Sequence, residues 1–191
     1  MTAPHEIALP GRAAGFAAQL AAGLPAVETR RLKLRAPRLE DFDAYAEIAT
    51  GPAGRFLIED PSRENAWFDF AQMVAAWLLR GHGLWSVETK EAAELVGFVL
   101  IGFEPGDHEP ELGYMLRPGF EGEGYAIEAA AAAKRCAFDV LDLPSLVSTV
   151  DRDNARSRRL AERLGGLRDA AAEAAHGDAI LVYRYAKKEA A

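Results

Sequence analysis

A glycine-containing turn that runs directly into an alanine-rich segment constrains this chain more than any other feature. Gly119, Gly122 and Gly124 lie in the turn, and residues 125–141 after it are strong helix formers. The first N–H groups of such a helix lack internal partners and carry the positive end of the helix dipole. We therefore expect an anion, such as a phosphate, to bind here. Gly122 and Gly124 would let that phosphate approach the main chain.

The turn differs from the two best-known phosphate loops. A Gly-Lys-Ser/Thr sequence, which defines the Walker loop, does not follow it. It also does not follow the opening strand of a βαβ repeat, as a Rossmann fingerprint should. Glycines in a strand-to-helix turn often only form the turn, so this segment by itself leaves the ligand open.

The remaining sequence predicts one α/β domain built on a sheet of mixed direction, with helices on both faces. Alternating or continuous apolar runs indicate the strands, and apolar residues at helical spacing indicate the helices. The expected strands are 31–35, 85–87, 95–101, 111–116, 146–150 and 179–185. The expected helices are 39–49, one capped by Ser62 that runs to Leu79, 125–141, and one from Asn154 to Leu164.

Residues 1–27 form a separate leader that is rich in Ala, Gly and Pro, and residues 28–191 form the domain itself. The leader has a possible helix over 11–22. It is either a surface-packed extension or an arm that grips a second subunit, as in a homodimer.

Composition excludes several classes of function. The formal net charge of −7 argues against nucleic-acid binding. One cysteine, Cys136, excludes an internal disulfide framework, and we expect it to be a small buried residue. The four histidines lack paired spacing, so no metal site is expected. The sequence shows neither a membrane-spanning run nor a signal peptide, and we expect a cytoplasmic protein.

Four stretches together resemble a known family. Residues 113–129 closely resemble the acetyl-CoA motif of the RimJ/RimL-like branch of the GNAT acetyltransferases. Residues 28–35 and 95–98 resemble the first and third strands of that branch, and 151–165 resemble its Asn-x-x-Ser helix. The resemblance implies a GNAT fold whose fourth and fifth strands splay apart. It also implies an N-acetyltransferase that uses acetyl-CoA as co-substrate and acts on a primary amine, a protein N-terminus or a small molecule.

The resemblance further implies direct transfer in a ternary complex and suggests where the cofactor lies. The pantetheine arm would pair with the main chain of Tyr114, Met115 and Leu116, and Gly113 would provide either a bulge or close packing. Asn154 would orient the arm, or else serve as a helix N-cap in competition with Asp153. The pyrophosphate would lie on the N–H groups around Gly119, Gly122, Glu123, Gly124, Tyr125 and Ala126.

The chemistry needs a base for the amine and an acid for the leaving thiolate. Glu111, on the same strand face as Gly113 and Met115, is the candidate base, with Glu109 and His108 behind it; a solvated strand-end carboxylate is the alternative. Ser157 is the candidate acid, or else a surface serine, because Ala161 occupies the position where many GNAT enzymes carry a tyrosine. A main-chain N–H near Met115 would meet the charge on the thioester oxygen.

Some residues depart from the family pattern. Glu121 and Glu123 bring two carboxylates to the phosphate loop, which should weaken cofactor binding. Gly166 replaces an aromatic residue, which should loosen the local core. These departures keep open a second hypothesis, a catalytically impaired module that binds an acyl-CoA or a partner protein. The stripe Trp67, Phe70, Trp77 is either core or a wall of the acceptor cleft.

Overall fold

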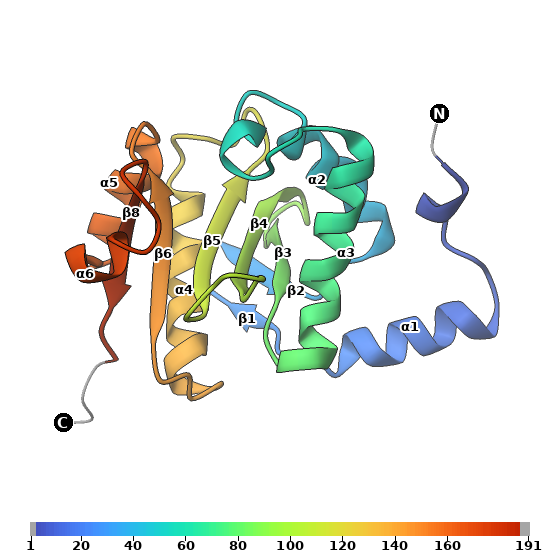
Figure 1. The fold of residues 1–191 in the computed structure, drawn as a ribbon. Helices are drawn as coiled ribbons and strands as arrows, with labels where there is room; N and C mark the ends of the chain where they lie inside the picture. Colours follow the sequence, from blue (N-terminus) through green and yellow to red (C-terminus); the bar gives the residue numbers. More distant parts are fainter. Residues whose placement is uncertain (1–2, 188–191) are drawn as a thin grey trace.

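Across residues 3–187, which the computed structural model describes, eight strands form one mixed sheet (Figure 1). Among these residues β5 and β6 form the one parallel pair, and the other neighbouring strands are antiparallel. The predicted α/β fold is therefore confirmed. In sheet order the strands are β1 (Val27–Glu28), β2 (Leu32–Arg35), β3 (Leu84–Thr89), β4 (Leu95–Gly102), β5 (Glu111–Leu116), β6 (Leu146–Asp151), β8 (Ile180–Tyr185) and β7 (Leu167–Arg168).

Helices cover both faces of the sheet. On one face α4 (Tyr125–Asp139) and α5 (Ala155–Arg163) contact each other, and the alanines of α4 are buried against the strands. On the other face α2 (Phe42–Ala49) and α3 (Arg63–Arg80) bury an aromatic cluster. Phe70 of that cluster and Trp77 are each 5% exposed, so these two residues of the predicted stripe are core.

Most predicted helix ends are confirmed. Ser62 Oγ accepts a hydrogen bond from Asn65 N at 3.2 Å, and α3 ends at Gly81 in the left-handed conformation. Residues Leu39–Asp41, predicted as the start of a helix, form a separate 3-10 turn, η2. The sequence did not predict β1, β7 or α6 (Ala170–Glu173), because elements of two to four residues are too short to show a period.

The structure decides between the two alternatives for Gly113 and contradicts the expectation for Gly166. The register of β4 and β5 continues without a bulge from Gly97–Leu116 to Gly102–Glu111. Gly113 instead serves close packing, since a Cβ there would lie 2.9 Å from the Leu100 side chain. The core at Gly166 is not loosened: a Cβ at that buried glycine would lie 3.0 Å from both Tyr183 and Tyr185.

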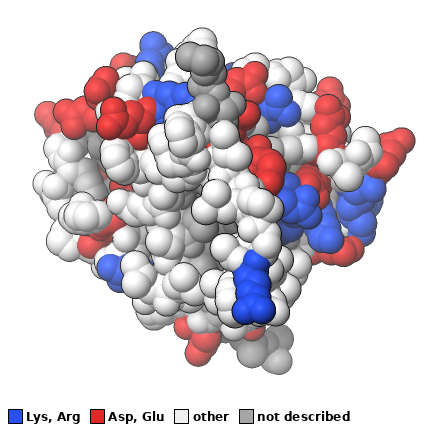
Figure 2. Space-filling view, turned by 90° about the vertical axis from the view of Figure 1, so that its right-hand side faces the viewer, with Lys and Arg blue, Asp and Glu red and all other residues white. Residues whose placement is uncertain are grey.

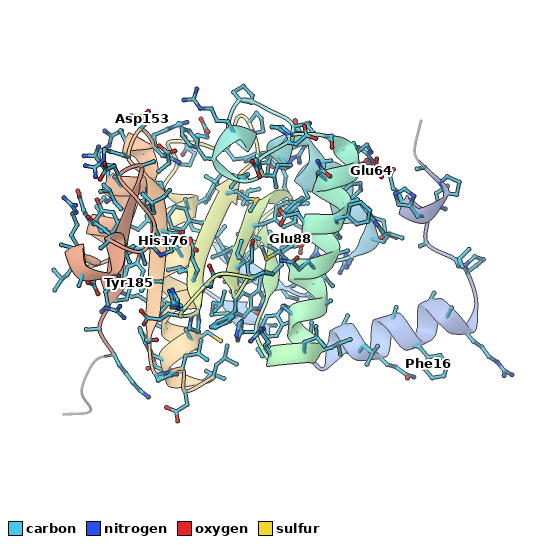
Figure 3. The ribbon with its side chains drawn as sticks, viewed as in Figure 1. Phe16, Glu64, Glu88, Asp153, His176 and Tyr185 are labelled. Carbon is cyan, nitrogen blue, oxygen red and sulfur yellow. The ribbon has the colours of Figure 1, made fainter. Side chains whose placement is uncertain are left out.

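The leader is anchored at both ends and stands away from the domain in between. Near its start the Glu6 carboxylate accepts two 2.8 Å bonds from Arg63, and near its end Pro25 O accepts a 2.7 Å bond from Trp85 Nε1. Between these anchors every residue of α1 (Arg12–Ala22) is exposed or half-buried, and Phe16 extends into the open (Figure 3). Figure 2, viewed from this side, shows few charged groups in the middle of the face. The homodimer stays a prediction.

A buried ion cluster fixes where α2 begins. The Arg35 guanidinium binds both oxygens of Asp41, at 2.7 and 2.9 Å, and Glu88 at 2.6 Å. Ser86 Oγ also donates to Asp41 at 2.7 Å. Burial alone would raise the pKa of Asp41, but these hydrogen bonds hold it below its ordinary value. Since α2 follows Asp41 directly, the cluster determines how α2 sits on the sheet.

Asp41→Ala should lower the free energy of unfolding by about 3–5 kcal/mol, because it leaves a buried guanidinium without its main partner. Urea unfolding at neutral pH measures this loss. Because the native pKa of Asp41 is depressed, the stabilisation is present above the ordinary aspartate pKa and should fade as the pH falls through the native value. Asp43→Ala is the control: that side chain is 73% exposed, and its loss should cost less than about 1 kcal/mol. Equal losses for the two variants would contradict the importance of the cluster.

Candidate active site

The sheet opens between β5 and β6. The two strands share one register pair, Glu111 with Val147, and Val147 N donates to Pro110 O at 3.0 Å. Beyond this point side chains take the place of main-chain ladder bonds. Ser148 Oγ donates to Leu112 O at 2.6 Å, and Glu111 Oε1 accepts from Thr149 N at 3.0 Å and from its hydroxyl at 2.6 Å. The strands therefore part at Glu111, as the splay of the resembled fold requires.

Alternation along β5 decides which main-chain groups face the opening. Arg117 N donates to Val96 O at 2.9 Å, and the β4–β5 register is unbroken. In an antiparallel pair, successive residues point alternately to the two neighbouring strands. The N–H and C=O of Tyr114 and Leu116 therefore face the opening, whereas those of Met115 face β4. The resemblance implied that the main chain of Met115 would also pair with the pantetheine arm, but its main-chain groups point away from the splay.

The glycine loop, residues 119–124, lies between the end of β5 and the start of α4. Gly119, Gly122 and Gly124 have φ values of 90°, 87° and 78°, and Gly124 is the N-cap of α4. A Cβ at Gly119 or Gly122 would meet no atom within 4 Å. The backbone conformation, rather than lack of space, therefore requires glycine in this loop. The first N–H groups of α4, at Tyr125 and Ala126, follow directly and remain available to an anion.

An arginine and a glutamate that the sequence did not single out hold this loop. Arg31 Nε lies 2.6 Å from Glu128 Oε2, and Arg31 Nη1 donates to Glu123 O at 2.9 Å. Thr29 Oγ1 donates to Glu128 at 2.6 Å, and the guanidinium lies 4.6 Å from the centre of the Tyr125 ring. The one feature of the sequence that could have indicated this contact was Glu128, an acidic residue in the first turn of a helix. By itself such a residue indicates only a favourable interaction with the helix dipole.

The two unusual glutamates of the loop are exposed. Glu121 lies 2.6 Å from Arg156 of α5, and both of these side chains are well exposed to solvent. Arg156 therefore offsets the charge of Glu121 beside the loop, while water screens Glu123. Glu123 takes part in the loop through its main-chain carbonyl, which binds Arg31.

The start of α5 faces β5 across the opening. Asn154 is the N-cap, and its Oδ1 accepts from Ser157 N at 3.1 Å; Asp153 does not take that position. Tyr114 Oη donates to Ser157 O at 3.0 Å and lies 3.0 Å from Ser157 Oγ. Burial raises the pKa of Tyr114, so its hydroxyl stays protonated. Ala161 is fully buried in a cluster with Val150, Leu181 and Tyr183 and contributes nothing to the opening.

A cavity of about 290 Å³ lies at the splay, on the sheet face covered by α2 and α3. Glu111, Gly113 and Met115 line it from β5, as their shared strand face predicts. Asp69 and Met73 line it from α3, so this helix does wall the cavity, although with residues outside the predicted aromatic stripe. The other lining residues are Tyr45, Phe56, Leu57, Leu100, Gly102, Glu104, Asp107, Tyr114 and Thr149.

The acidic residues around β5 differ sharply in their surroundings. Burial raises the pKa of Glu111 to about 7, against the lowering effect of the Thr149 hydrogen bonds and with a further rise from Asp107 and Glu104. Glu109 is paired with Arg184 at 2.5 and 2.6 Å, which lowers its pKa. It lies with His108 in a second cavity of about 180 Å³, which also reaches Glu111. Glu111 thus has the proton affinity that a base needs near neutral pH.

The remaining sequence candidates can be placed briefly. Cys136 is buried in α4, and burial raises the pKa of its thiol. Within residues 3–187, no group of three His, Cys, Asp or Glu side chains is positioned to hold a metal ion. Over the same residues, no helix is both long and apolar enough to traverse a bilayer.

Comparison with known proteins bears on the family and the fold. Residues 31–166 match a family model described as an acetyltransferase (GNAT) domain. The N-acetyltransferase YnaD of Bacillus subtilis (strain 168), itself uncharacterized, is 29% identical over 154 residues, which cover 75% of this chain and 83% of that protein. The crystal structure of an acetyltransferase from Agrobacterium tumefaciens str. C58 has 36% identity and a TM-score of 0.78, covering 86% of this chain and 95% of its own. A ribosomal-protein-S5-alanine acetyltransferase from Vibrio fischeri shares the fold at 15% identity and a TM-score of 0.64, covering 86% and 98%.

One glutamate should titrate near pH 7 in carboxyl-carbon NMR, because Glu111 is buried beside other carboxylates. Glu111→Gln should remove that resonance. Thr149→Val should raise its pKa further, since the Thr149 hydroxyl bond favours the ionised form. A titration near pH 7 that survives in Glu111→Gln would assign the shifted pKa to another carboxylate.

Proposed function

The chain belongs to the GNAT family of N-acetyltransferases, and from that premise we propose that it moves an acetyl group from acetyl-CoA to a primary amine by direct attack in a ternary complex. One observation carries the proposal: the cavity of about 290 Å³ and the opening between β5 and β6 meet at Glu111, Gly113 and Tyr114. An amine in the cavity and a thioester in the opening would therefore lie side by side, which is the proximity that the reaction needs.

The residues present suit acetyl-CoA as co-substrate, which the family implies. The left-handed glycines and the N–H groups of Tyr125 and Ala126 would hold the pyrophosphate. The open main-chain groups of Tyr114 and Leu116 would pair with the pantetheine arm. Asn154, as the N-cap of α5, would stand on the other side of that arm.

The reaction would proceed by attack of the amine nitrogen on the thioester carbon. The attacking amine loses a proton to Glu111, and the C–S bond breaks as the new C–N bond forms. The thiolate takes a proton through the Ser157 hydroxyl, which lies within hydrogen-bond distance of Tyr114 Oη and regains a proton from solvent in the same step. Glu111 then releases the proton of the amine to solvent. The N–H of Tyr114, which faces the opening, would meet the charge on the thioester oxygen. Overall, one proton moves from nitrogen to sulfur.

Two further expectations belong to the same proposal. A cytoplasmic location agrees with a single buried thiol, Cys136, and with the supply of acetyl-CoA that the reaction needs. A homodimer through the leader would cover the exposed side of α1.

Calorimetric titration with acetyl-CoA should show saturable binding that Gly124→Glu abolishes. The substitution strains a left-handed residue and places a carboxylate at the phosphate loop. Gly165→Glu is the matched control, because Gly165 is also left-handed, with φ of 82°, but lies after α5. The control should cost similar stability and keep the affinity. Failure of the native protein to bind acetyl-CoA would instead favour the impaired module.

Ser157→Ala should lower kcat by about 10- to 100-fold with little change in the Kd for acetyl-CoA, because it removes the proton donor to sulfur. Tyr114→Phe should lower kcat less, since the serine hydroxyl stays in place. Thiol release during turnover gives kcat, and calorimetry gives the Kd. Full activity in both variants would mean that the sulfur takes its proton from another source.

A further inference from the structure

The ionisable groups that line the cavity of about 290 Å³ are acidic. Four of its lining residues are carboxylic acids, namely Asp69, Glu104, Asp107 and Glu111. Among the described residues that line it, none is Lys, Arg or His. The cofactor loop, by contrast, has Arg31 and Arg156 beside it. A cavity with this lining attracts cations and repels anions.

The carboxylates form a row of electrostatic neighbours. Asp69 raises the pKa of Glu104, and Glu104 in turn raises that of Glu111, in each case after the larger effect of burial. Asp107 raises the pKa of both glutamates. Like charges held this close repel one another, and a bound cation would relieve the repulsion. The four carboxylates therefore favour a ligand with more than one positive charge over a simple monoamine.

Asp69 is positioned for this role by its own hydrogen bond. Its Oδ2 accepts a 2.5 Å bond from the hydroxyl of Tyr45, which is 1% exposed. Burial raises the pKa of Tyr45 well above its ordinary value, so the phenol stays a donor and holds the carboxylate in one orientation. Glu104 and Asp107 share a turn that is closed by a 2.6 Å bond from Glu104 N to Asp107 Oδ2. Hydrogen bonds thus fix the Asp69 carboxylate on α3 and the Asp107 carboxylate on the β4–β5 turn, whereas Glu104 is an exposed residue that is held through its main chain.

The walls between these charges are apolar. Phe56, Leu57, Met73, Leu100 and Met115 line the same cavity. Its volume of about 290 Å³ is just below the range of roughly 300–1,000 Å³ for small-molecule sites, which favours a small acceptor. Apolar walls and acidic groups together suit a short alkyl chain that carries a cation at each end.

From this lining we propose that the acceptor is a small diamine: one amine reacts beside Glu111, and the second, still protonated, is held by Asp69 and Glu104. The inference rests on the proposed function, and it adds the charge and size of the acceptor. Asp69 would be a specificity-determining residue, because it binds the distant cation and takes no part in the proton transfer.

Thiol release with 1,4-diaminobutane and with n-butylamine tests the proposal. The two probes have the same carbon chain and differ in the second amine. We expect kcat/KM for the diamine to exceed that for the monoamine by about tenfold or more, since a hydrogen bond to a charged group is at stake. A peptide with a free N-terminus is the third probe and should be a poorer acceptor than the diamine.

Asp69→Asn should remove that preference while keeping an acceptor for the Tyr45 hydroxyl. It should raise KM for the diamine by about tenfold, leave kcat within about twofold, and change the monoamine little. Glu64→Gln is the matched control: it removes one negative charge from the exposed side of α3, outside the cavity (Figure 3), and should leave both substrates unchanged.

The outcomes separate the two proposals. Equal rates for diamine and monoamine, a preference for the peptide, or no effect of Asp69→Asn would overturn the diamine proposal and leave the acetyltransferase in place. Thiol release with none of the three probes, despite acetyl-CoA binding, would count against the proposed function itself. In that case calorimetry measures diamine binding to the protein–CoA complex. Binding to the native protein that Asp69→Asn loses would support the diamine site. No binding to the native protein would overturn it.

Discussion

The divergence of β5 and β6 is the constraint on which the rest of the structure depends. Two neighbouring parallel strands would normally continue their ladder, and an open pair leaves main-chain groups without partners inside the protein. Here the Glu111 carboxylate and the Ser148 hydroxyl replace the first missing bonds, to Thr149 N and Leu112 O. These side chains end the ladder at a defined residue. Tyr114 and Leu116, one step further along, then keep open groups that a ligand can use.

That single opening joins the two faces of the sheet. On the α4 and α5 side, the glycine loop and the Tyr114–Ser157 pair border it, and on the α2 and α3 side the acidic cavity does. Glu111 belongs to both parts, because its Oε1 makes the last bonds of the β5–β6 ladder and its side chain also lines the cavity. A group that is fixed by Thr149 and buried among other acids is held in place at a raised pKa, which suits a base. The same residue thus ends the ladder and, under the proposed function, would serve as the base.

How much the sequence could predict depends on how local each feature is. The glycine loop, the N-cap Asn154 and the position of Ser157 were predictable, because turns, caps and helix starts are determined by a few adjacent residues. Asp69, Tyr45 and Glu104 were not, because they come from three separated segments and meet only when α3 packs on the sheet. Asp69 by itself looks like any polar residue on an amphipathic helix. The sequence left a bulge and close packing open for Gly113 and wrongly predicted a loose core at Gly166, because a glycine pattern does not distinguish these from tight packing against Leu100 or Tyr183.

Two acidic clusters of the same protein show how the sequence separates stability from function. Asp41 and Glu88 are matched by Arg35, and the cluster lowers the pKa of Asp41 and holds α2 in place. In the cavity, Glu104 and Glu111 have raised pKa values because burial and neighbouring acids oppose their ionisation. Such an arrangement costs folding free energy at neutral pH, since the unfolded chain ionises these groups freely. The buried Asp41 has a cationic partner, whereas the described residues that line the cavity include four carboxylic acids and no Lys, Arg or His. The proposed diamine would supply that cationic partner.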